Sequence, residues 1–121
     1  MFVVFRKVGG FYHVFDGDSY ILNYLFNYKI VGNRVGFPVG SIHKVVNTLE
    51  DKKINYELDG KKVNFKRKNN YEKYLEKGKV KYNFKRDIEK IYDKLDQLNS
   101  KNLKEILNFI EGKLDEWIFN C

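Results

Sequence analysis

Apolar residues are spaced in two different ways along this 121-residue chain, and the change comes near residue 69. Before it, short runs rich in β-branched and aromatic residues alternate with glycine-containing turns, which is typical of strands joined by tight connections. After it, apolar residues recur every three or four positions, as in amphipathic helices. We therefore expect an α/β part over 1–68 and a helical extension over 69–121, within a single domain.

The α/β part has the predicted order β-β-α-β-α-β-β and an α/β fold class. Gly9-Gly10 separates two strands, at 2–8 and 11–15, and Asp16-Gly17-Asp18 offers an N-cap for a helix over about 18–28. The remaining elements are a strand at 29–37 with a turn at Gly32-Asn33, a helix capped by Ser41 with the stripe Ile42, Val45, Val46 and Leu49, and a hairpin of strands 54–58 and 61–66 around Asp59-Gly60.

The second part is predicted to be helical throughout. A short helix over 70–77 should end at Gly78, because glycine commonly follows a helix. Two longer helices, joined at Asn99-Ser100, should form an αα-hairpin. Their apolar faces hold Ile88, Ile91, Tyr92, Leu95 and Leu98 in 85–98, and Leu103, Ile106, Leu107, Ile110, Leu114, Trp117 and Ile118 in 101–119.

Those stripes are free to pack on the sheet, on each other or on a second copy of the chain. A homodimer joined through Leu103–Ile118 is therefore one expected partnership.

The lone Cys121 cannot form an internal disulfide, and no window is apolar enough for a membrane span, so we expect a cytoplasmic protein with no membrane partner.

The net charge of +7 is concentrated in one segment. Residues 61–86 carry eleven Lys or Arg against two Asp or Glu, whereas 1–60 are nearly balanced and 87–121 are acidic. Such a cluster favours a polyanionic partner, DNA or RNA, because each phosphate contact releases condensed counterions. A soluble, lysine-rich surface is the alternative. The candidate phosphate contacts are Lys61, Lys62, Lys66, Arg67, Lys68, Lys79, Lys81, Lys85 and Arg86.

Period-two alternation along 61–68 would put Lys62, Asn64, Lys66 and Lys68 on one face of a strand. Further on, Tyr82 lies among lysines, a combination that suits backbone contact together with base stacking. Aromatic residues on a half-buried strand with lysines outside would give the same sequence pattern.

Val8–Phe15, which reads Val-Gly-Gly-Phe-Tyr-His-Val-Phe, is similar to the segment Met-Gly-Asp-Phe-Tyr-Glu-Leu-Phe of the MutS mismatch-recognition domain. Arg34–His43 resembles that family's Met-Ala-Gly-[Ile/Val]-Pro segment, and Val45–Glu57 parallels its following helix and strand. The resemblance covers residues 5–58. It implies a MutS-domain-I-like mixed β-sheet with flanking helices, to which the αα-hairpin is added.

The resemblance also implies a role for Phe11, which falls at the position of the aromatic ring that stacks on a mispaired base. An apolar ring can enter a weak base step and offset the unstacking. His13 replaces the family's carboxylate and Gly10 its aspartate. His13 can still hydrogen-bond a base. Phe11 is alternatively a sheet aromatic that points into the core.

The expected function is non-catalytic nucleic-acid binding, with no cofactor and no metal. Glu57-Leu-Asp59-Gly-Lys61 is similar to the end of a nuclease motif but is also an ordinary hairpin turn, and capping explains Asp16 and Asp18 better than a metal site with His13 does. An alternative function is an inhibitor from a phage or mobile element, anti-CRISPR-like, that binds a host protein–nucleic acid complex.

Overall fold

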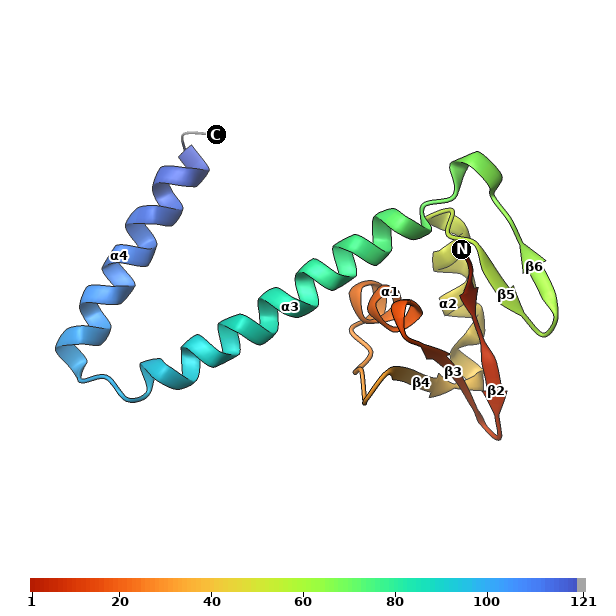
Figure 1. Cartoon of the computed structure of the whole chain (residues 1–121), viewed down its shortest axis with the longest axis horizontal. Coiled ribbons are helices and arrows are strands. Elements are labelled where there is room, and N and C mark those ends of the chain that lie inside the picture. The colour runs from red at the N-terminus through yellow and green to blue at the C-terminus, as the bar shows by residue number, and fades with distance from the viewer. Residues whose placement is uncertain (120–121) are drawn as a thin grey trace. The chain divides into compact units, whose positions relative to one another are not determined.

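A computed structural model describes residues 1–119. The chain forms two compact units, the first from Met1 to Phe84 and the second from Lys85 to the C-terminus (Figure 1). The boundary at residues 84 and 85 falls within the helix Tyr71–Leu95, which begins close to residue 69, where the sequence predicts the change from α/β to helical structure. Cys121, on which the expected compartment partly rests, lies outside the described residues.

Unit 1 is a mixed α/β structure, as predicted, but it has two small sheets in place of one. The sheets have the strand orders β1-β5-β6 and β2-β3-β4. Their strands are β1 (Val3–Val4), β2 (Arg6–Val8), β3 (Phe11–Phe15), β4 (Arg34–Pro38), β5 (Tyr56–Leu58) and β6 (Lys61–Val63), and the helices are α1 (Gly17–Phe26), η1 (Val39–Ser41), α2 (Ile42–Asp51), η2 (Lys66–Lys68) and the start of α3 (Tyr71–Leu95).

The N-terminal strand changes sheets at Phe5, which is why the predicted single sheet is wrong. β1 pairs in parallel with β5, and β2 pairs antiparallel with β3. Between them the buried Phe5 ring makes edge contacts with Tyr12, Phe37 and Tyr56 at centroid distances of 5.9–6.4 Å. The ring thus fills the junction of the two sheets.

The core of unit 1 lies between the sheets and the helices and is mainly aliphatic. The apolar stripe of α2 is present as predicted, since Val45 and Leu49 are buried. Asp16 and Ser41 precede α1 and α2, but neither makes a side-chain capping hydrogen bond. The fully buried side chains include Val3, Val14, Ile21, Leu22, Val35, Phe37, Val45, Leu49, Ile54 and Tyr71.

Helix α3 continues through Gly78, where the sequence predicts an end. A Cβ atom at Gly78 would lie 2.5 Å from the backbone oxygen of Tyr20 on α1. The glycine therefore permits a close helix–helix approach and is not a stop signal. A hydrogen bond also joins the start of α3 to α1, because the Tyr71 hydroxyl donates to Asp18 Oδ1 at 2.5 Å.

Unit 2 consists of the end of α3 and α4 (Ser100–Phe119). The predicted turn and cap at Asn99-Ser100 is confirmed, since Asn99 Oδ1 accepts a hydrogen bond of 2.9 Å from the Asn102 amide. No residue of α4, all of which is described, is buried. The predicted αα-hairpin is therefore found as two connected helices without a core between them. None of the helices in residues 1–119 is both long and apolar enough to span a membrane.

Candidate nucleic-acid interface

The outer face of the β2-β3-β4 sheet carries a row of rings from β3. Side chains alternate along a strand, so Tyr12 and Val14 face the core whereas Phe11, His13 and Phe15 face outward. The Phe11 side chain is 50% exposed. Phe11 is therefore a surface ring, and the alternative in which it points into the core is wrong.

The three rings lie close enough to form one continuous aromatic surface. The centroids of Phe11 and His13 are 6.5 Å apart, and those of His13 and Phe15 are 6.3 Å apart. The ring planes of both pairs are tilted by less than 40°. Such a row can receive successive bases, since every base has a flat face that stacks on an aromatic ring.

The strand register places cations on both sides of this row. Arg6 on β2 lies opposite His13, and Arg34 on β4 lies opposite Phe15. Directly opposed residues of an antiparallel pair share a face of the sheet. Both arginines are exposed, as is Lys29. A surface groove of about 480 Å³ is lined by Phe11, His13, Tyr28, Lys29, Val31, Arg34 and Gly36.

Gly36 sets the position of the His13 ring. The two residues are directly opposed, and a Cβ at Gly36 would lie 2.9 Å from His13 Cε1 and 3.0 Å from His13 Nδ1. His13 Nδ1 is buried and has no hydrogen-bond partner among residues 1–119. Packing on Gly36, not a hydrogen bond from Nδ1, therefore positions this ring.

The first half of the predicted basic segment is divided between strand β6 and the short helix η2. The strand expected over 61–66 ends at Val63, because Asn64 Oδ1 accepts hydrogen bonds from the Lys66 amide and the Asn55 side chain. The predicted one-face alternation over 61–68 is therefore wrong. Lys62 lies over the Phe2 ring at 5.6 Å. The exposed positions are Lys61, Lys62 and the η2 residues Lys66, Arg67 and Lys68.

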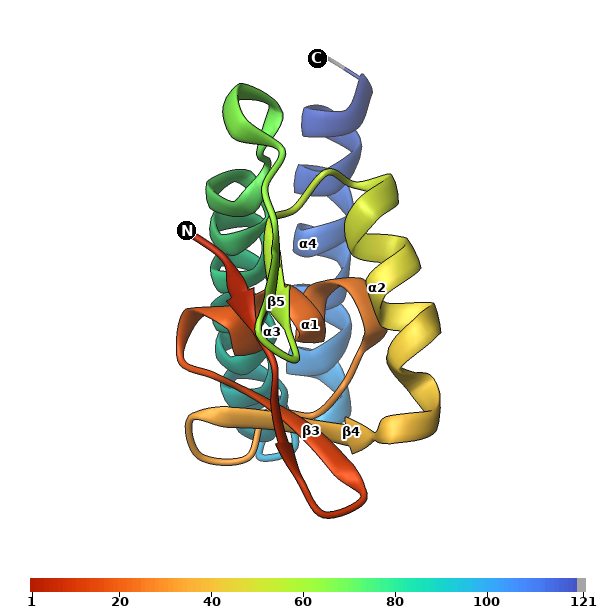
Figure 2. The same cartoon turned by 90° about the vertical axis from the view of Figure 1, so that its right-hand side faces the viewer.

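Figures 1 and 2 show the loop that contains η2, in green, at one end of unit 1 and the turn between β2 and β3, in red, at the other end. Phe11 follows that turn directly. The structure thus does not bring Phe11 and His13 together with Lys66, Arg67 and Lys68. Lys61 and Lys62 begin β6, after a turn whose Asp59 accepts a hydrogen bond from the Tyr12 hydroxyl.

The second half of the basic segment is helical, and part of it packs on α1. Tyr82 makes an edge contact with Tyr20 at a centroid distance of 5.5 Å, and Lys81 Nζ lies 5.3 Å from the centre of the Tyr24 ring. These contacts hold α3 against α1. Lys85 and Arg86 are exposed and belong to unit 2.

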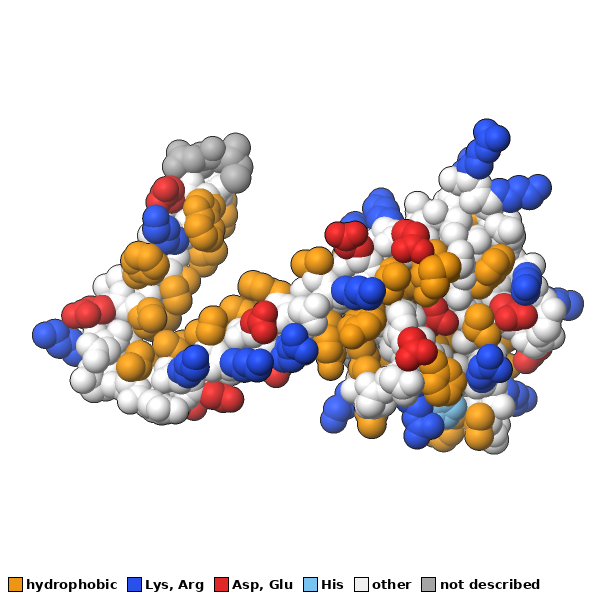
Figure 3. All heavy atoms as spheres, viewed as in Figure 1, with side chains coloured by type: hydrophobic (Ala, Val, Ile, Leu, Met, Phe, Trp, Pro, Cys, Tyr) orange, Lys and Arg blue, Asp and Glu red, His pale blue; other side chains and the backbone are white. Residues whose placement is uncertain are grey.

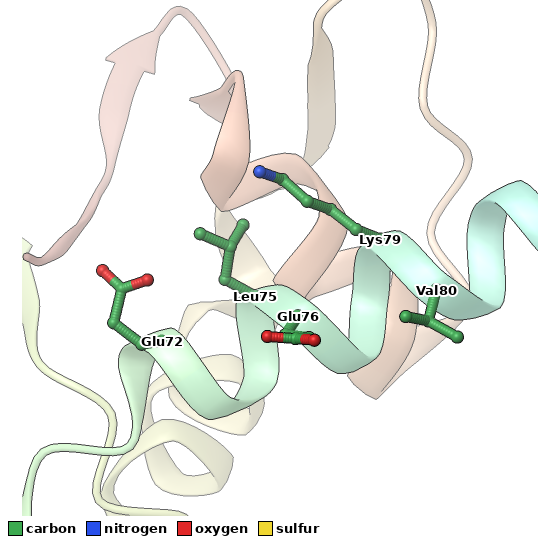
Figure 4. A pocket seen from close by; sticks show the side chains of 5 residues that line it. All are labelled: Glu72, Leu75, Glu76, Lys79 and Val80. Atoms are coloured by element: carbon green, nitrogen blue, oxygen red, sulfur yellow. The ribbon is translucent and has the colours of Figure 1, made fainter.

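Lys79 borders a separate hollow of about 280 Å³ along α3, with Glu72, Leu75, Glu76 and Val80. In Figure 4, Lys79 and Leu75 extend toward the ribbon of α1. The hollow has carboxylates on its rim and no aromatic ring in its lining. It therefore does not extend the aromatic surface of the sheet.

Sequence reasoning found Phe11 and His13 but not Arg6, Phe15, Lys29 and Arg34. Period-two spacing from Phe11 could have indicated Phe15. The arginines become neighbours of the rings only through strand register, which the local pattern did not supply. Among residues 1–119 there is no cluster of three or more His, Cys, Asp or Glu side chains arranged to hold a metal ion.

Comparison with models of protein families, with curated proteins and with solved structures gave no match.

Proposed function

We propose that unit 1 is a non-catalytic nucleic-acid-binding module that holds unpaired bases on the outer face of the β2-β3-β4 sheet. One observation carries the proposal: the exposed Phe11 ring continues into His13 and Phe15, with Arg6 and Arg34 on either side. Rings for bases and flanking cations for phosphates are the two components of single-strand recognition.

The resemblance of residues 5–58 to the MutS recognition domain supports the same face. It aligns Phe11 with the ring that contacts a mispaired base, and Phe11 is accessible for such a contact. A mispaired base is less well stacked than a paired one, so the cost of exposing it to a protein ring is lower. Mismatched duplexes and single strands are therefore both proposed ligands.

The exposed cations at Lys61, Lys62 and 66–68 are proposed as a second, sequence-independent phosphate contact. Of these, Lys66, Arg67 and Lys68 belong to the loop at the other end of unit 1 from the β2-β3 turn, so they would hold the backbone of a longer ligand without touching the stacked bases. Their contribution should fall as salt rises.

Fluorescence anisotropy with single-stranded DNA, RNA, intact duplex and mismatched duplex, each at two salt concentrations, tests the proposal. We expect tighter binding to ligands with unpaired bases and a negative salt slope. Phe11→Ala should lose about 1–3 kcal/mol of binding free energy with little change in slope, since base stacking is removed. Arg34→Gln should reduce the slope by about one.

Phe109→Ala is the matched control, because Phe109 is 64% exposed on α4, outside unit 1. A triple Gln variant of Lys66, Arg67 and Lys68 measures the second contact separately. The proposal fails if no ligand binds at low salt, or if Phe11→Ala binds single strands as tightly as the unchanged chain.

A further inference from the structure

Within the apolar face of each helix of unit 2 runs a seam of residues with alternating spacings of three and four. In α3 and the following turn the seam is Ile88, Ile91, Leu95 and Leu98, and in α4 it is Leu103, Leu107, Ile110 and Leu114. A strict three-four repeat is the pattern of helices that pair side by side with other helices.

Neither seam is covered within the described structure. Ile88 is 45% exposed and Leu107 53% exposed, and in unit 2 no described residue is buried. Figure 3 shows these hydrophobic side chains, in orange, along α4 and along the adjoining part of α3. Because helical stability in water comes mainly from burial of an apolar face, these helices need a partner.

The charges around the seams favour a second copy of the chain as that partner. Residues 85–121 carry seven Lys or Arg against eight Asp or Glu, so two copies do not repel each other strongly, and a polyanion gains little here. Lys104 and Glu111 lie seven residues apart on one side of the α4 seam, as Asp87 and Lys94 do beside the α3 seam. In each helix the two charges have opposite sign.

Antiparallel pairing of like helices makes this arrangement self-complementary. When Leu107 of one α4 packs on Ile110 of the other, Lys104 of each copy faces Glu111 of the other. In α3, packing of Ile88 of one copy on Ile91 of the other brings Asp87 of each copy to Lys94 of the other. Both helices thus share one mode of pairing.

The exposed area of the seams reaches the lower end of the range for a specific dimer. The seam side chains expose on the order of 600 Å² per copy, so pairing would bury roughly 1,200 Å² in total, which reaches the range of specific protein interfaces. We propose that unit 2 is a self-association surface, through which two copies of this chain pair antiparallel along the seams of α3 and α4. This inference does not depend on nucleic-acid binding by unit 1.

Light scattering of the full chain over a range of concentrations tests the pairing. We expect the mass of a dimer that dissociates on dilution. Leu107→Glu puts a charge in the seam and should give a monomer. Phe109→Glu, at a position that is 64% exposed and lies off the seam, should leave the dimer intact. Near-UV circular dichroism, which reports the buried tyrosines of unit 1, checks that this unit remains folded in each variant. A chain that stays monomeric at every concentration overturns the proposal.

Charge reversal tests the antiparallel register without touching an apolar residue. Lys104→Glu and Glu111→Lys should each weaken the dimer roughly tenfold, because two cross-copy pairs become repulsive in either variant. The double variant K104E/E111K restores both pairs and should dimerise like the unchanged chain. A double variant as weak as the single variants would refute the proposed pairing.

Discussion

Asp18 joins three segments of unit 1 through one half-buried carboxylate. Its Oδ2 atom accepts a hydrogen bond of 3.0 Å from the Val4 amide, and its Oδ1 atom accepts one from the Tyr71 hydroxyl. Burial raises the pKa of the Asp18 carboxyl, while the hydrogen bonds from Tyr71 and Val4 oppose that rise. The net direction is upward, so folding disfavours the charged form of Asp18 relative to the unfolded chain.

This direction predicts a pH dependence. A carboxyl whose pKa is higher in the folded than in the unfolded chain adds stability below its unfolded-state pKa and loses it as pH rises through the folded-state pKa. Asp18→Asn removes the titration but can keep both contacts, since its amide can donate to the Tyr71 hydroxyl and its oxygen can accept from Val4. The variant should therefore gain stability relative to the unchanged chain as pH rises from 4 to 7.

Urea unfolding at several pH values, monitored by near-UV circular dichroism, measures this difference in the free energy of unfolding. Asp115→Asn, on exposed α4, is the control and should show no such trend. If the difference between Asp18→Asn and the unchanged chain grows as pH falls, the assignment to Asp18 is wrong.

At the scale of elements, the contact of α1 with α3 depends on Gly78. Alanine is a better helix former than glycine by about 1 kcal/mol, so helix propensity alone favours Gly78→Ala. The added Cβ would, however, meet the Tyr20 backbone oxygen at 2.5 Å, and that backbone cannot rotate away as a side chain can. We expect Gly78→Ala to destabilise unit 1 by about 1–3 kcal/mol, as overpacking does.

Gly112→Ala in α4 is the matched control, because its Cβ would meet no described atom within 4 Å. That variant should leave the stability of unit 1 unchanged and favour the α4 helix. Thermal unfolding of both variants tests the pair. Equal effects of the two substitutions would mean that the α1–α3 approach does not require a glycine.

Gly78 also shows where sequence reasoning reached its limit. Local chemistry was enough for the stripe of α2 and for the Asp59-Gly60 hairpin turn, whose signals lie within a few residues of each other. It was misleading at Gly78, because a glycine that ends a helix and a glycine that lets another helix approach look alike in sequence. Only the position of Tyr20, 58 residues earlier, separates the two.

The candidate interface was predictable to a similar extent. The motif singled out Phe11 and His13, and alternation within β3 makes them neighbours on one face. Arg6 and Arg34 join them through pairings with β2 and β4 that no local pattern specified. The high density of lysines in 61–86 is evident from the sequence. The sequence did not show that these lysines are distributed over a strand, a short helical turn and a long helix.

At the scale of the whole molecule, stability is unevenly distributed. The buried core belongs to Met1–Phe84, whereas the described part of unit 2 buries no residue. A chain that ends after Phe84 should therefore keep the thermal midpoint of unit 1. In the full chain, the helical signal of unit 2 should decrease on dilution while that of unit 1 does not, because only an associating segment depends on concentration.

Far-UV circular dichroism of the full and shortened chains at several concentrations measures both effects. A shortened chain that fails to fold would show that unit 1 needs residues beyond 84. A full chain with a single, concentration-independent transition would show that the two units unfold together.

The change of sheets at Phe5 has a consequence for the order of folding during synthesis. The β2-β3-β4 sheet closes through contacts between residues that leave the ribosome close together, so it can form early. β1, although synthesised first, pairs with Tyr56–Leu58 and must wait for that strand to emerge. The hydrogen bond between Asp18 and Tyr71 can form only later, after Tyr71 has emerged. The nascent chain thus presents its aromatic sheet face before the core beneath it is closed.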